Sequence, residues 1–309
     1  MSVPKISIVI PVFNEEKVLE KLFERLLPVM EGMKREYEVV LVDDGSIDGS
    51  LKILRSHASD NVVVVELSRN YGQHAAVFAG FETSTGEIIV TLDADLQNPP
   101  EEIPRLVDVM ENGGYEVVGT VRVMRQDTIF RKTASKIVNA ITRRITGVHL
   151  SDWGCMLRAY KRHVVEYMVS SREHSTFIPA LATSFAKDIA EIEVRHEERF
   201  AGESKYSLGK LISLHFDLVT SFSDFPLKFM LYAGFFLAFF GIGFGTFLAV
   251  ARLAYGAAWA AEGIFTLFAV LFFLVGAQFL AFGVMGEYVG RIYKEVKQRP
   301  PYTIRRIYP

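Results

Sequence analysis

Two long runs without a charged residue constrain the fold of this 309-residue chain more than any other feature. They cover residues 229–251 and 263–286. A helix of that length spans about 35 Å, enough to cross a hydrocarbon core about 30 Å thick. Helices in the core of soluble proteins seldom run so long without a charge. We therefore predict two transmembrane helices joined by a short loop.

The small net charge of −2 combines regions of very different character. Residues 1–226 carry 26 basic and 33 acidic groups, whereas residues 287–309 carry six basic and two acidic groups. The 60 residues between them carry only Lys228, Arg252 and Glu262. The overall balance argues against a nucleic-acid partner and against a disordered acidic chain.

Lys and Arg residues cluster outside the two apolar runs, while the loop between them contains only Arg252. The positive-inside rule then predicts a protein that crosses the membrane twice, with both termini in the cytoplasm. The single cysteine, Cys155, fits a reducing compartment. We expect four segments: a cytoplasmic domain (1–205), amphipathic interfacial helices (206–226), the two transmembrane helices (227–286) and a basic cytoplasmic tail (287–309).

The first 120 residues alternate between apolar strands and amphipathic helices. We expect strands at residues 6–12, 37–42, 62–67, 87–92 and 115–119. We expect helices at residues 15–33, 51–57 and 73–83, and a further one that opens at Pro99-Pro100. Continuous apolar strands between helices predict an α/β fold with a doubly wound, parallel sheet. Ligands bind such sheets at the carboxyl ends of the strands.

Polar motifs follow the expected strands, and they do not match a dinucleotide or P-loop fingerprint. Asp93, Asp95 and Gln97 come directly after the fourth strand. Hard oxygen ligands of this kind suit Mg²⁺ or Mn²⁺. Such a metal neutralises a nucleotide diphosphate as it leaves. A D-x-D pattern alone is weak evidence, but here it accompanies PVFNE and VDDGS at the ends of the first two strands.

Residues 120–162 reverse the sign of the acidic domain, with ten basic residues against Asp127 and Asp152. Residues 130–146 also carry an apolar stripe at helical spacing. A basic amphipathic helix suits an anionic membrane surface. We therefore expect a basic rim that brings a nucleotide and metal site to an anionic lipid acceptor.

These motifs resemble a known family. PVFNEE, VDDGS, RNYGQH, TLDADLQNPP and ERFAGESKYS are similar to family 2 glycosyltransferases of the polyprenyl-phosphate group, which are related to dolichol-phosphate mannose synthase. The similarity covers about residues 5–300. It implies a Rossmann-like GT-A domain with a mostly parallel sheet, followed by two transmembrane helices. The resemblance further implies a multi-pass protein of the inner membrane with a short periplasmic loop. It also implies an inverting enzyme that uses Mg²⁺ or Mn²⁺ and forms a homo-oligomer, typically a tetramer.

Longer segments, among them NYGQHAA, WGCMLRAY and GESKYS, resemble the branch of this family that transfers 4-deoxy-4-formamido-L-arabinose from its UDP donor to undecaprenyl phosphate. This branch serves lipid A modification and polymyxin resistance. Two alternatives stay open from the sequence. One is a polyprenyl-phosphate glucose or mannose transferase, which shares the metal site and differs in the donor pocket. The other is a non-catalytic membrane scaffold that retains a glycosyltransferase-like domain.

The resemblance also implies roles for individual residues. The expected nucleotide-binding residues are Pro11, Phe13, Glu15, Asp43, Asp44, Arg199 and Lys205. Either Asp43 or Asp44 would bind the uracil ring, and Arg199 and Lys205 would close over the donor phosphates.

The remaining expected roles concern the metal, the chemistry and the acceptor. Asp95 and Gln97 would hold the metal, and Asp93 would contact the ribose or the metal region. Asp152 occupies the catalytic carboxylate position. Arg122 and Arg131 would bind the lipid phosphate. His74 has two open interpretations, a contact with the donor sugar or a structural role, and Cys155 is expected to be a small buried residue.

Overall fold

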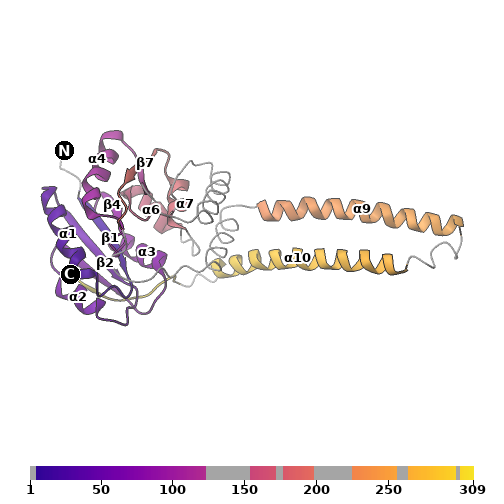
Figure 1. Cartoon of the computed structure of the whole chain (residues 1–309), viewed down its shortest axis with the longest axis horizontal. Coiled ribbons are helices and arrows are strands. Elements are labelled where there is room, and N and C mark those ends of the chain that lie inside the picture. Colours follow the sequence, from indigo (N-terminus) through magenta and orange to yellow (C-terminus); the bar gives the residue numbers. More distant parts are fainter. Residues whose placement is uncertain (1–4, 123–153, 172–176, 198–224, 256–263, 297–299) are drawn as a thin grey trace. The chain divides into compact units, whose positions relative to one another are not determined.

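The computed structural model describes residues 5–122, 154–171, 177–197, 225–255, 264–296 and 300–309 (Figure 1). The chain divides into two compact units. The first combines Met1–His215 with Pro300–Pro309, and the second is Phe216–Arg299.

The first unit is built on one sheet with the strand order β7-β5-β6-β4-β1-β2-β3-β8. Its strands are β1 (Ile6–Val12), β2 (Tyr37–Asp43), β3 (Val62–Leu67), β4 (Ile88–Thr91), β5 (Val117–Arg122), β6 (Arg158–Lys161), β7 (Ile189–Val194) and β8 (Ile304–Tyr308). The four central strands β4, β1, β2 and β3 are mutually parallel. Strand β6 is antiparallel to both β4 and β5, so β5 and its parallel neighbour β7 run in the direction of the central strands. The predicted mostly parallel α/β sheet is confirmed.

Helices cover both faces of the sheet (Figure 1). One face carries α1 (Leu19–Gly32), α2 (Ser50–Ser56), the short 3₁₀ helix η1 (Pro100–Glu102) and α4 (Ile103–Gly113). The other carries α3 (Gln73–Thr83), α6 (Arg162–Ser170) and α7 (Ile178–Phe185). Successive strand residues serve opposite faces, since Ile8 and Ile10 pack on the α1 side and Val9 packs on the α3 side.

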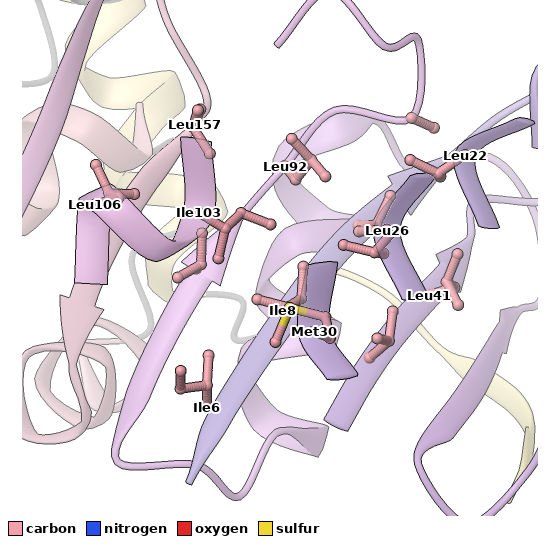
Figure 2. Packing of buried hydrophobic residues seen from close by; sticks show 14 of the residues in the cluster. Ile6, Ile8, Leu22, Leu26, Met30, Leu41, Leu92, Ile103, Leu106 and Leu157 are labelled. Atoms are coloured by element: carbon pink, nitrogen blue, oxygen red, sulfur yellow. The ribbon is translucent and has the colours of Figure 1, made fainter. Parts of the chain in front are cut away.

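The packing of α1 shows how the apolar pattern is used. In Figure 2, Leu22, Leu26 and Met30 lie on the side of α1 that faces the sheet, near Ile8 and Leu41. All five side chains are fully buried. Each such burial stabilises the fold by about 1.5–3 kcal/mol before entropy is counted. This packing holds β1 and β2 in a register that pairs Val12 with Asp43, so both strands end at the same level.

Two features of the sheet differ from the sequence interpretation. Residues 304–308, expected to be part of a basic tail, form β8 and pair antiparallel with β3. Arg158, counted with the basic rim, is fully buried in β6, where its Nε donates to the Cys155 carbonyl at 2.9 Å. A strand between β4 and β5 buries both of its faces, so the charge of Arg158 does not reach the surface. The amphipathic segments expected at residues 130–146 and 206–225 lie outside the described residues, apart from Phe225.

The second unit contains two long helices, α9 (Phe225–Tyr255) and α10 (Ile264–Val296). Each contains a window apolar enough to cross a membrane: Leu227–Phe247 has a mean hydropathy of 1.8 and Phe273–Gly290 has a mean hydropathy of 1.3. No residue of either window is buried in the described part of the chain, unlike the core helix of a soluble protein. Large side chains such as Phe239, which is 83% exposed, need an apolar environment. The two helices therefore indicate association with a membrane.

Candidate active site

The loops that follow β1, β2, β3 and β4 lie together at the carboxyl edge of the sheet. The backbone continues the strand pairing into these loops, since Asp44 N donates to Val12 O at 2.8 Å and Leu92 N donates to Val9 O at 3.0 Å. The sheet therefore brings the motifs of residues 11–15, 43–46, 68–72 and 93–97 to one edge. This is the edge at which parallel sheets bind ligands.

A set of hydrogen bonds joins the β1 loop to the β2 loop. Asn14 N donates to Ser46 Oγ at 3.0 Å, and Asn14 Oδ1 accepts from Ile47 N at 2.9 Å. Glu15 N donates to Ser50 Oγ at 2.9 Å. The sequence interpretation named Glu15 but missed Asn14, Ser46 and Ser50. The available signal was the residue type: Asn14 has a φ of 56°, a conformation that asparagine tolerates better than most residues.

The predicted nucleotide-pocket residues Pro11, Phe13 and Glu15 all lie at this edge and are partly exposed. Pro11 is the penultimate residue of β1 and is paired with Val42. The carbonyl of Glu15 accepts from Val18 N at 3.0 Å and Leu19 N at 3.2 Å, which starts α1 directly after the loop. The side chains that follow β1 are thus presented from a short and well-anchored turn.

The structure separates the two aspartates at the end of β2. Asp44 accepts from Tyr71 N at 2.7 Å through one carboxylate oxygen and from Gly72 N at 2.8 Å through the other. Asp43 accepts from Ser46 N at 3.3 Å through Oδ2. Its Oδ1 is buried and has no hydrogen-bond partner among the described residues. Burial raises the pKa of both carboxyl groups. Asp44 therefore anchors the loop after β3, whereas Asp43 keeps an acceptor that the protein does not use.

A glycine permits the close contact between the β2 and β3 loops. Gly45 has a φ of +68°, and a Cβ placed on it would lie 2.5 Å from the backbone carbonyl carbon of Arg69. Any side chain at this position would be strained and would also push away the loop that Asp44 holds. The motif VDDGS thus needs its glycine for backbone geometry.

The predicted metal motif, residues 93–97 directly after β4, has an unusual backbone conformation. Leu96, between Asp95 and Gln97, is buried and has a φ of 61°. This left-handed conformation costs a non-glycine residue on the order of 1–2 kcal/mol. Two hydrogen bonds brace the turn: Gln97 N donates to Asp95 Oδ1 at 3.1 Å, and Gln97 O accepts from Glu197 N at 2.9 Å. On the preceding side, Gln73 Nε2 donates to Asp93 Oδ1 at 2.7 Å.

The donor set of this motif fits a hard divalent cation. Asp93, Asp95 and Gln97 offer carboxylate and amide oxygens within one five-residue turn. The described residues contain no cluster of three or more His, Cys, Asp or Glu side chains that would form a complete protein cage. Mg²⁺-type sites usually take one or two carboxylates from the protein and complete their shell with water and substrate phosphates. The residues present match that arrangement.

The structure describes only one of the five remaining predicted site residues. Arg122 ends β5, which runs parallel to β4, so Arg122 lies toward the same edge as the motifs. Arg131, Asp152, Arg199 and Lys205 lie outside the described residues. Their roles stay predictions.

His74 is half-buried, whereas Cys155 is fully buried. Burial lowers the pKa of His74, whose ring stands edge-on to Phe177 at 6.0 Å between centroids. This neutral, packed ring favours a structural role. Cys155 is buried, its Sγ accepts from Thr120 Oγ1 at 2.9 Å, and the prediction of a small buried residue is confirmed.

Comparison with known proteins agrees with this geometry. The family described as glycosyl transferase family 2 matches residues 7–168. Proteins named undecaprenyl-phosphate 4-deoxy-4-formamido-L-arabinose transferase from Photorhabdus laumondii and Klebsiella pneumoniae are each 53% identical over 308 residues, covering 99% of this chain and 94% of theirs. The crystal structure of glucosyl-3-phosphoglycerate synthase from Mycobacterium tuberculosis with Mn²⁺, UDP-glucose and phosphoglyceric acid superposes with a TM-score of 0.50 at 21% identity. That match covers 70% of this chain and 79% of the synthase. The chain belongs to glycosyl transferase family 2.

Proposed function

We propose that this protein transfers 4-deoxy-4-formamido-L-arabinose from its UDP donor to undecaprenyl phosphate. The observation that carries the proposal is the 53% identity, over nearly the full length of both chains, to transferases that bear this name. The described strand-end motifs supply a site of the right chemistry. They also argue against a non-catalytic membrane scaffold that retains only a glycosyltransferase-like domain.

The donor would bind at the carboxyl edge of the sheet. Asp43 is the better candidate for the uracil ring, because its buried Oδ1 is an unused acceptor that suits the imide N–H of the base. Asp95 and Gln97, with Asp93 beside them, would hold Mg²⁺ or Mn²⁺. When bound, the metal supplies positive charge that neutralises the UDP leaving group. Mn²⁺ is present in the M. tuberculosis neighbour, which makes it the first ion to test here.

The reaction is a displacement at the anomeric carbon of the sugar. An oxygen of the lipid phosphate forms the new bond to that carbon as the bond to UDP breaks, which inverts the anomeric centre. A phosphate monoester has a second pKa of about 6 and is mostly ionised at neutral pH, so it needs little help from a base. Arg122 would orient this phosphate together with Arg131. Asp152 would orient the acceptor or stabilise positive charge that develops on the sugar.

Chain connectivity supports a membrane hairpin formed by α9 and α10. Strand β7 precedes α9 and strand β8 follows α10, yet both strands belong to the same sheet. One folded domain cannot lie on both sides of a membrane, so α9 and α10 must cross it an even number of times. The excess of Lys and Arg outside the apolar runs supports a cytoplasmic location for the domain and both termini. Tetrameric assembly stays a prediction that light scattering of the detergent-solubilised protein would test.

A donor panel tests the proposal. Purified full-length protein, undecaprenyl phosphate and Mn²⁺ or Mg²⁺ would be combined with the UDP derivative of formamido-arabinose, UDP-glucose or GDP-mannose. We expect a glycolipid from the first donor alone, and no product with the Asp95→Ala variant. Product from UDP-glucose in place of the formamido-arabinose donor would refute the donor assignment. Full activity of Asp95→Ala would refute the metal site.

A further inference from the structure

Arg25 joins three parts of the chain that lie far apart in sequence. Its guanidinium projects from α1 and donates to Glu101 at 2.9 and 2.8 Å and to Glu197 at 2.9 and 3.1 Å. Glu101 belongs to η1, four residues after Gln97. Glu197 lies three residues after the end of β7. The bonds from Arg25 lower the pKa of Glu101, so that carboxylate is ionised near neutral pH.

The connection leads directly to the metal motif. The backbone N–H of Glu197 donates to the carbonyl of Gln97 at 2.9 Å, so Arg25 fixes the residue that braces the motif. Its second partner, Glu101, follows the same motif along the chain. Leu96, which directly precedes Gln97, has a left-handed conformation. A strained residue persists only where the surrounding structure holds it in place.

A comparison within α1 shows that this arrangement does more than add an ion pair. Arg35, which follows α1, makes a two-bond pair with Glu111 of α4 at 2.8 and 3.2 Å. That pair links the segment after α1 to α4 on the same face of the sheet, but neither of its residues bonds to the metal motif in the described contacts. Half-exposed ion pairs of this type add little to global stability. The side chains of Glu101 and Glu197 are 50% and 48% exposed. Arg25 therefore differs from Arg35 because its partner Glu197 is bonded to the metal motif.

We propose that Arg25 is a positioning residue for the metal motif and that it acts through Glu197. By holding Glu197 beside Gln97, it keeps the turn of residues 95–97 in the strained shape that presents Asp95 and Gln97 to the cation. Partners that orient metal ligands commonly change metal affinity by 10- to 100-fold when removed. The inference rests on the proposed metal and UDP site, and it is independent of which sugar is transferred.

The test compares UDP binding with and without Mn²⁺ by titration calorimetry on purified full-length protein. The variants are Arg25→Ala, Arg25→Lys, Glu197→Gln and the matched control Arg35→Ala. We expect Arg25→Ala to weaken Mn²⁺-dependent UDP binding about tenfold and to change metal-free UDP binding little. Lysine at position 25 should restore part of the loss, because it keeps the charge without the two-carboxylate fork. Glu197→Gln should follow Arg25→Ala, and Arg35→Ala should bind as the wild type does.

Thermal unfolding separates positioning from stability. Arg35→Ala removes the more buried guanidinium, 9% exposed against 21% for Arg25, so we expect it to lower the melting temperature at least as much as Arg25→Ala does. Normal Mn²⁺-dependent binding in Arg25→Ala, or an equal loss in Arg35→Ala, would overturn the positioning role. Wild-type protein that binds UDP equally with and without Mn²⁺ would instead overturn the metal site itself. The two failures are therefore distinguishable, and neither depends on the donor panel.

Discussion

Replacing Asp43 with asparagine should separate nucleotide binding from folding. The carboxylate of Asp43 has two acceptor oxygens, one facing Ser46 N and one buried without a partner among the described residues. An asparagine amide has one acceptor oxygen and one donor group in the same space. It can accept from Ser46 N or from the imide of uracil, and the other partner then meets an N–H₂ group.

The expected loss follows from that one bond. A hydrogen bond to a charged group contributes about 1.5–3 kcal/mol, so Asp43→Asn should weaken UDP binding by about 10- to 150-fold. Stability should not fall in parallel. Burial raises the folded-state pKa of Asp43, so the stabilisation linked to its proton is complete below the unfolded pKa of about 3.9. That stabilisation is lost as the pH rises through the folded value. Asparagine cannot ionise, so above the folded-state pKa of Asp43 the Asp43→Asn variant avoids the cost of a buried charge.

The matched variant is Asp44→Asn. Both oxygens of Asp44 accept from backbone N–H groups, so an amide leaves one of those donors facing another donor. We expect a loss of about 1–3 kcal/mol in the free energy of unfolding. Calorimetric titration with UDP and urea unfolding at pH 7.5 measure both quantities. The reasoning is refuted if Asp43→Asn binds UDP with wild-type affinity, or if Asp44→Asn keeps full stability and alone loses binding.

Three further predictions concern the same edge of the sheet and its borders. Gly45→Ala should destabilise the domain by about 1–3 kcal/mol, because its methyl group meets the Arg69 backbone at a positive φ; urea unfolding measures this loss, and an unchanged midpoint would contradict it. Glu66→Ala should lower the free energy of unfolding by about 1–3 kcal/mol, since Glu66 accepts from Arg305 at 3.0 Å and from Tyr308 at 2.7 Å. Hydrogen exchange should become faster only in β3 and β8, and unchanged exchange in these strands would contradict the prediction. Charge reversal at Arg122 together with Arg131 should raise the KM for undecaprenyl phosphate more than the dissociation constant of UDP, and an equal effect on both would disprove the phosphate role.

The apolar pattern of the sequence is sufficient to locate most elements in the half of the sheet that contains β1 to β4. Residues 6–12, 62–67 and 73–83 were predicted as the elements that the structure shows at β1, β3 and α3. The fifth strand was placed early, since β5 covers Val117–Arg122 instead of residues 115–119. These elements were predictable because each is bounded by turn residues and buries a continuous or periodic set of apolar side chains.

Strand β8 was not predictable in the same way. Its sequence, IRRIY, places two arginines in a short segment beside a membrane helix, which favours a basic tail. The strand pairs antiparallel with β3, where Glu66 also accepts hydrogen bonds from Arg305 and Tyr308. That partner lies more than 200 residues earlier in the chain. No pattern within residues 304–308 themselves indicates that β3 is their partner.

By itself, the sequence determined the class of protein: two apolar helices, an α/β domain, and polar motifs at the ends of its strands. Only the tertiary structure decided which hydrogen bonds Asp43 and Asp44 each make. Adjacent residues at a strand end point in different directions and contact different loops. The tertiary structure also decided the burial of Arg158 and the link from Arg25 to Gln97 through Glu197. These features depend on contacts between residues that are distant along the chain, which hydrophobic periodicity and local motifs do not encode.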